Sequence, residues 1–127
     1  MILVDTSIWI DHFRLSDAEL RRVIENDLLL CHPFVTGELA LGSLRDRTNV
    51  LGFLAAQRQA AVATHDEILT MIDRHALFSM GIGYTDAHLL ASVLLGRGAS
   101  LWTRDKRLKL AAEKAGVSLH VSATTTN

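Results

Sequence analysis

The sequence predicts an α/β domain with a largely parallel sheet that helices cover on both faces. Short apolar runs alternate along the chain with longer amphipathic stretches, which is typical of strands joined by crossover helices. No internal repeat, low-complexity block or linker interrupts this alternation. We therefore expect a single domain over residues 1–127, with 122–127 as a loose tail.

The first third of the chain predicts two strands and three helices. Residues 2–4 form a short apolar run. Residues 28–31 form another, which is sharply bounded by Asp27 before it and Pro33 after it. Helical spacing of apolar residues follows at 6–14, 16–26 and 33–44. The expected helix starts are a cap at Thr6 or Ser7, a cap at Ser16 or Asp17, and Pro33 as a first helical residue.

The rest of the chain repeats the alternation. The sequence "GIGY" predicts a loop, because two glycines favour a break between helices. Glycines also predict two helix ends, one at Gly96 or Gly98 and the other at Gly116. The expected elements are helices at 49–59, 65–80, 85–98 and 103–116, strands at 100–102 and 118–121, and a possible brief strand at 61–63.

Composition narrows the class of protein. Of 127 residues, 49% are hydrophobic, yet no run approaches the roughly 20 apolar residues that cross a bilayer. No basic segment precedes the first apolar run, so we expect no signal peptide, no membrane partner and a cytoplasmic location. The single cysteine, Cys31, follows three leucines, which favours a buried thiol over a nucleophile.

Charge is distributed unevenly along the chain. Residues 1–96 hold 7 basic and 12 acidic side chains, whereas 97–127 hold 6 basic and 2 acidic ones. The basic residues are densest in "RDKRLK", residues 104–109. Such a segment permits attraction to a polyanion, although a solvated helix face has the same composition.

Four carboxylates occupy positions that predict one site. Asp5 ends the first predicted strand, Asp105 follows the strand at 100–102, and Asp86 begins the helix after the glycine loop. In parallel α/β sheets, ligands bind where the carboxyl ends of strands meet. Glu38 lies in an apolar helical stripe, where a carboxylate is costly without compensation. Each aspartate alone could instead stabilise a helix N-terminus, and Glu38 could face solvent or pair with Arg45.

Convergent carboxylates remain ionised together only if a cation holds them, and an all-oxygen site suits Mg²⁺ or Mn²⁺. The six histidines form no zinc-type motif, although His88 lies two residues from Asp86. A divalent ion held by carboxylates can promote phosphodiester hydrolysis, for which the basic segment would bind the phosphate backbone. These two features together predict a nuclease.

Four stretches of the sequence resemble the PIN-domain ribonucleases, and specifically the VapC-type toxins of toxin-antitoxin pairs. They are "ILVDTSIWID", "TGELALG", "YTDAHLLA" and "LWTRDKRL", in the family's order and spacing. The resemblance implies a three-layer α/β/α sandwich around a short, mostly parallel sheet. It also implies that Asp5, Glu38, Asp86 and Asp105 bind Mg²⁺ or Mn²⁺ and act in catalysis.

The resemblance further implies supporting polar roles for Thr6 and Thr103, an RNA substrate, a cognate antitoxin and a homodimer. Arg104, Lys106 and Arg107 are the candidate phosphate contacts. Arg107 departs from the family, in which many members carry an acid or a histidine at this position.

Two other functions remain open at this stage. One is a PIN-like module that binds RNA or protein without cleavage. The other is a receiver domain that accepts phosphate on an aspartate beside Mg²⁺, although no acceptor aspartate and distant lysine are convincingly placed for it.

Overall fold

Three short parallel strands form the centre of the fold. The computed structural model describes residues 1–121, and the predicted tail at 122–127 lies outside them. The strands are β1 (Ile2–Val4), β2 (Leu29–Leu30) and β3 (Ser100–Trp102), in the order β2-β1-β3. Strand β1 is central because every residue in it is apolar and buried. Leu3 pairs with Leu30 on one side and with Leu101 on the other.

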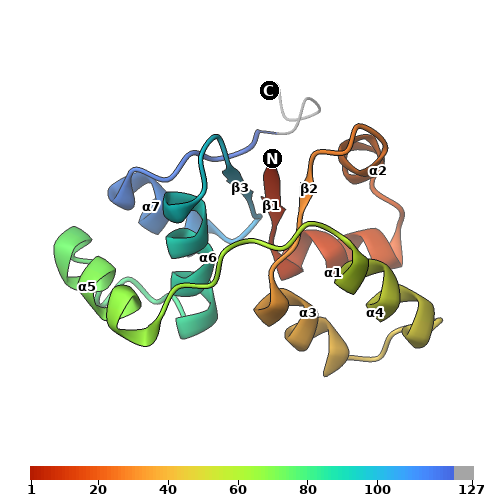
Figure 1. Cartoon of the computed structure of the whole chain (residues 1–127), viewed down its shortest axis with the longest axis horizontal. Coiled ribbons are helices and arrows are strands. Elements are labelled where there is room, and N and C mark those ends of the chain that lie inside the picture. The colour runs from red at the N-terminus through yellow and green to blue at the C-terminus, as the bar shows by residue number, and fades with distance from the viewer. Residues whose placement is uncertain (122–127) are drawn as a thin grey trace.

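Seven helices surround the sheet within the described residues. Figure 1 shows α1 to α4 on the side of β2 and α5 to α7 on the side of β3, with the strands between the two groups. This arrangement confirms the expected α/β class with a parallel sheet between helical layers. The helices are α1 (Thr6–Arg14), α2 (Ala18–Glu25), α3 (Pro33–Ala40), α4 (Arg47–Ala56), α5 (His65–His75), α6 (Tyr84–Leu95) and α7 (Lys106–Ala115).

Side-chain caps define the starts of α1 and α2, and the cap of α1 differs from the prediction. Helix α1 begins at Thr6, but its cap is Asp5, whose Oδ1 accepts a hydrogen bond from the Thr6 N–H at 2.8 Å. The strand therefore passes directly into the helix with no separate turn residue. Asp17 caps α2 and Pro33 occupies the first turn of α3, both as expected.

Several predicted boundaries are wrong by a few residues. Helix α3 ends at Ala40, not at residue 44, and α5 ends at His75 because Ala76 adopts a left-handed conformation with φ of 51°. Helix α7 begins at Lys106, not at residue 103, because Asp105 is its cap. Helix α4 covers 47–56, not 49–59, and α6 begins one residue early. The end of α6 is as predicted, because Gly96 is its C-cap.

Two predicted strands are absent among the described residues. Residues 61–63 form no strand, and the segment 118–121 makes only one isolated bridge, between Leu119 and Leu101. Both segments are apolar enough for a strand, but neither is paired along its length. The sheet therefore has three strands, not four or five.

The core lies on both sides of the sheet. Leu3, Ile8, Leu20, Leu90 and Leu108 are fully buried, and they come from β1, α1, α2, α6 and α7. Burial of each such side chain stabilises the fold by about 1.5–3 kcal/mol. Within the described part of the chain, no helix combines the length and apolarity needed to cross a membrane.

Candidate active site

Asp5 is held rigidly where β1 meets α1. Its Oδ2 accepts hydrogen bonds from the Thr103 hydroxyl at 2.7 Å and from the Ser7 hydroxyl at 3.0 Å. Together with the bond from the Thr6 N–H to Oδ1, three donors fix a carboxylate that is only 6% exposed. Charge-assisted bonds of this kind compensate for burial and set the direction of the carboxylate.

Thr103 joins two of the four acids. It follows β3 and is buried, and its hydroxyl donates to Asp5 while accepting a hydrogen bond from the Asp105 N–H at 3.1 Å. Asp105 in turn caps α7 through its Oδ1, which accepts from the N–H groups of Arg107 and Leu108. Because β1 and β3 are adjacent and parallel, their carboxyl ends bring Asp5 and Asp105 to the same edge.

Glu38 reaches this edge from α3 and is bound by Thr6. The Thr6 hydroxyl donates to Glu38 Oε1 at 2.7 Å. Glu38 is exposed rather than enclosed by apolar side chains. Of the alternatives that the sequence left open for Glu38, the structure therefore shows the one that faces solvent. Thr6, the first residue of α1, connects Glu38 of α3 with the end of β1.

Asp86 lies in the first turn of α6, with its Oδ2 accepting a hydrogen bond from the Gly83 N–H at 2.9 Å. Burial raises the pKa of the Asp86 carboxyl above its ordinary value, and that hydrogen bond partly offsets the rise. The negative charges of the other three predicted acids raise the pKa further. Asp86 therefore experiences the field of Asp5, Asp105 and Glu38 together.

The four acids are electrostatic neighbours without being a closed coordination cage. In the structure as described, none of them forms an ion pair with a basic side chain. Among residues 1–121, no three histidine, cysteine, aspartate or glutamate side chains lie close enough to hold a metal ion as they stand.

The basic segment after β3 divides into two parts. The Arg104 guanidinium pairs with Asp11 and, at 2.7 Å, with Asp17, so its charge is already balanced by two carboxylates. Lys106 and Arg107 are exposed at the start of α7 and form no ion pair with any described residue. Arg107 lies against Gly81, where a Cβ would come within 3.0 Å of its Cδ.

His88 belongs to an aromatic cluster. Its ring lies 4.4 Å from that of Phe34 and 4.7 Å from that of Tyr84, and the side chain is buried. The buried ring of His32 is also near, and burial lowers the pKa of His32 to about 4. Cys31 is buried as well, as expected, and burial raises the pKa of its thiol to about 11, which disfavours the thiolate form.

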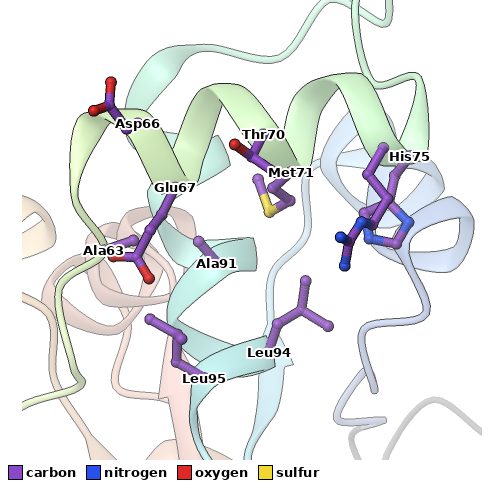
Figure 2. Close-up of a pocket in the computed structure, with 10 residues that line it drawn as sticks. Ala63, Asp66, Glu67, Thr70, Met71, His75, Ala91, Leu94 and Leu95 are labelled. Carbon is purple, nitrogen blue, oxygen red and sulfur yellow. The ribbon is translucent and has the colours of Figure 1, made fainter.

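Two hollows differ in their relation to the acids. One, of about 370 Å³, contains none of the four. Figure 2 shows that its walls are α5, with Glu67 and Met71, and α6, with Leu94 and Leu95. The other, of about 580 Å³, includes Glu38 and lies between α1 and the segment after α3. Of these two hollows, only the second is next to a candidate site residue.

Ser7 contributes to the site in a role that the sequence did not predict. Its hydroxyl donates to Asp5 and accepts a hydrogen bond from the Arg104 N–H at 3.3 Å. A signal for this role is present, because Ser7 lies two residues after Asp5 in a helix start. Such a position also suits a helix cap, and the local pattern does not separate the two roles.

Comparison with known proteins agrees with this geometry. Residues 2–114 match the PIN domain family. The chain is 53% identical over 119 residues to Ribonuclease VapC32 of Mycobacterium tuberculosis, in strain CDC 1551 / Oshkosh and in strain ATCC 25618 / H37Rv. Each alignment covers 94% of this chain and 96% of the relative. The chain belongs to the PIN-domain family and, within it, to the VapC-type ribonucleases.

Proposed function

We propose that this protein is a Mg²⁺- or Mn²⁺-dependent endoribonuclease and the toxin of a toxin-antitoxin pair. The observation that carries the proposal is a group of four carboxylates. Three of them act electrostatically on the fourth, Asp86, and none of the four is paired with a basic side chain among residues 1–121. The 53% identity to a protein named as a ribonuclease supports RNA as the substrate.

The donor chemistry of the site fits a hard divalent cation. All four candidate ligands are carboxylates, which are the ligands that Mg²⁺ and Mn²⁺ prefer. Asp5, Glu38, Asp86 and Asp105 would hold the ion, and the positive charge would relieve the repulsion that raises the pKa of Asp86. A bound ion of this kind supplies a Lewis acid that activates water and stabilises charge on a phosphodiester.

The chain's own residues provide orientation. Thr103 and Ser7 fix Asp5, while Thr6 fixes Glu38, so two of the acids are directed by hydroxyl groups. Lys106 and Arg107 lie at the start of the helix that Asp105 caps, and we propose that they contact phosphates of the substrate. Arg104 holds α1 and α2 through Asp11 and Asp17, so we assign it a structural role in addition to any phosphate contact.

The sharpest variant for testing this proposal is Asp86→Asn. The Asp86 carboxylate accepts only one hydrogen bond from a described residue, which an asparagine oxygen can also accept. Asp5→Asn is less clean, because both oxygens of Asp5 accept hydrogen bonds and an amide has only one oxygen to accept them. We expect Asp86→Asn to fold normally and to lose cleavage of RNA.

A second measurement tests metal binding without relying on activity. If the acids hold an ion, Mn²⁺ at about 100 times its dissociation constant stabilises the parent chain by about 2.7 kcal/mol. We expect the melting temperature of the parent to rise with Mn²⁺ or Mg²⁺ and that of Asp86→Asn to rise far less. Without metal, the variant should be at least as stable as the parent, because one repelling charge is removed.

The outcomes separate the candidate functions. RNA cleavage by Asp86→Asn at the parent's rate would overturn the mechanism. Binding of RNA by the parent without cleavage under any metal would favour the non-cleaving module. Growth arrest on expression, relieved by Asp86→Asn and by a small protein encoded beside the gene, is the result expected of a toxin with a cognate antitoxin.

We also propose a homodimer, as the family resemblance implies. The hollow of Figure 2 is bordered by Leu94 and Leu95 of α6, which are 44% and 50% exposed. Exposed apolar groups gathered at one place are typical of protein interfaces. Light scattering of the purified chain is expected to give twice the 14.0 kDa monomer mass, and Leu95→Glu is expected to lower it.

A further inference from the structure

The hollow beside Glu38 has walls of two different origins. One wall is the outer part of α1, with Ile10, Phe13 and Arg14. The opposite wall includes Glu38 near the end of α3 and Arg45 in the segment that follows. One wall therefore contains a candidate catalytic acid, and each wall contributes an arginine.

A single face of α1 connects the acids with this hollow. Thr6, Ile10 and Arg14 are spaced by four residues, so they lie along one side of the helix. Thr6 binds Glu38 at one end of this line, and Arg14 is the last residue of α1 at the other. The line spans about 12 Å at a helical rise of ~1.5 Å per residue.

The two arginines are available for an external anion. Neither Arg14 nor Arg45 forms an ion pair or a side-chain hydrogen bond with any residue among 1–121, and both are exposed. In contrast, Arg104 is paired with two carboxylates. Positive charges that line a groove next to acidic catalytic groups complement a strand of phosphates.

Phe13 adds a flat apolar surface to the same hollow. Its ring stacks on Trp9 with centroids 5.8 Å apart, yet the residue remains 39% exposed. The packing against Trp9 fixes the ring in place before any ligand arrives. A fixed aromatic ring beside arginines is the combination with which proteins bind single-stranded nucleic acid.

We propose that this groove binds the single-stranded RNA next to the bond that is cleaved. Arg14 and Arg45 contact phosphates, and Phe13 stacks on a base. The length of the α1 line corresponds to about three or four nucleotides at ~3.4 Å per stacked nucleotide. The proposal rests on the ribonuclease function proposed above, and it adds contacts on the side of the acids away from Lys106 and Arg107.

The test uses single-stranded RNAs cleaved at one mapped position and lengthened stepwise on either side of it. For the parent chain, kcat/KM is expected to rise over about the first four nucleotides added on one side only. Arg14→Ala and Arg45→Ala are each expected to lose about 3- to 10-fold of that rise and to cleave the shortest RNA as the parent does. Arg14→Lys should retain most of the rise in kcat/KM with RNA length.

Salt dependence and a matched variant provide the controls. The slope of log kcat/KM against log salt is expected to become shallower by about 0.7 for each phosphate that a variant no longer neutralises. Arg97→Ala removes the same charge from an exposed arginine that lies between α6 and β3, at the amino end of the sheet. It is expected to leave both the length dependence and the salt slope unchanged.

The possible failures are distinguishable. If both alanine variants keep the full length dependence, the groove does not bind substrate and the inference is wrong. The same conclusion follows if they lose only inhibition by the antitoxin, since the groove then binds a protein. If the parent cleaves no RNA, the proposed function fails. Anisotropy of a labelled oligouridylate of about 12 nucleotides, with Asp86→Asn and the Asp86→Asn/Arg14→Ala pair, then decides whether the groove binds RNA.

Discussion

Replacing Thr103 with valine removes one buried hydroxyl and leaves the shape of the side chain almost unchanged. That hydroxyl donates to Asp5 at 2.7 Å and accepts from the Asp105 N–H at 3.1 Å. Thr103 is 3% exposed, so water does not readily replace either bond. The substitution therefore tests whether the arrangement of two acids depends on a single oxygen atom.

The cost can be worked from these contacts. A hydrogen bond to a charged group is worth about 1.5–3 kcal/mol, and one between neutral groups about 0.5–1.5 kcal/mol. Asp5 keeps the bond from Ser7 at 3.0 Å, which limits the destabilisation. We expect the free energy of unfolding to fall by about 2–3 kcal/mol, which lowers the melting temperature by roughly 10 °C.

Activity is expected to fall further than stability alone explains. Without the Thr103 hydroxyl, Asp5 is held by Ser7 and by the Thr6 N–H, and its carboxylate can rotate away from Asp105. Misplaced catalytic groups cost up to about 100-fold in rate. We expect kcat to fall by about 10- to 100-fold at a temperature where the variant is fully folded, while KM changes little.

Thr103→Ser is the matched control, because it keeps the hydroxyl and removes only a methyl group. It is expected to cost about 1 kcal/mol in packing and to retain most of the activity. Urea unfolding and a steady-state RNA cleavage assay measure both quantities. If Thr103→Val matches the serine variant in kcat and in stability, the hydroxyl does not position Asp5 and the reasoning is refuted.

Three further predictions concern stability and substrate binding. The pKa of His32 is lowered from 6.5 to about 4 by burial first and by the charge of a neighbouring histidine second, so the folded chain favours the neutral ring. The contribution of the neutral His32 ring to stability is therefore complete above pH ~6.5 and is lost as the pH falls towards 4, by roughly 3 kcal/mol in all. His32→Asn keeps the helix cap and should flatten the dependence of the free energy of unfolding on pH. An unchanged dependence would contradict this prediction. Gly81→Ala places a Cβ on a residue with φ of 77° and against the Arg107 side chain, so we expect the free energy of unfolding to fall by about 1 kcal/mol. We also expect a higher KM for RNA, which Arg107→Ala should reproduce. An unchanged KM in both variants would remove Arg107 from the substrate contacts. Thr64→Ala breaks the capping box with Glu67 and should lower the free energy of unfolding by about 1 kcal/mol, while RNA cleavage stays unchanged. Loss of cleavage in the folded variant would count against the assigned site.

Asp5 and Asp105 show which part of the site follows from sequence. Each comes directly after or shortly after an apolar run, and each caps the next helix. Parallel pairing then places both at one edge, a consequence of strand direction that needs no knowledge of packing. Periodicity and turn residues are sufficient for this pair.

Glu38 and the short strands show what sequence does not determine. The apolar spacing around Glu38 predicts burial, yet the side chain is exposed, because α3 packs with Val35 and Leu39 on a different face. Residues 61–63 and 118–121 are apolar enough for strands, but strand formation also requires a partner with free backbone groups at the right distance. Such partners are set by the tertiary fold.

Ion pairs between distant segments are equally beyond prediction from local sequence. Arg104 meets Asp11 and Asp17 across separations of 93 and 87 residues. No local pattern specifies which of several surface carboxylates such an arginine finds. The same is true of Arg107, whose position against Gly81 depends on the loop conformation before α6.

The central strand is synthesised before both of its neighbours, and its second neighbour is made almost a hundred residues later. Leu3 pairs with Leu101, and the last carboxylate of the site follows at Asp105. A nascent chain that stops short of this point has neither its third strand nor its fourth acid. The four acids can therefore come together only after the segment with Asp105 has left the ribosome, and translation itself delays completion of the proposed site.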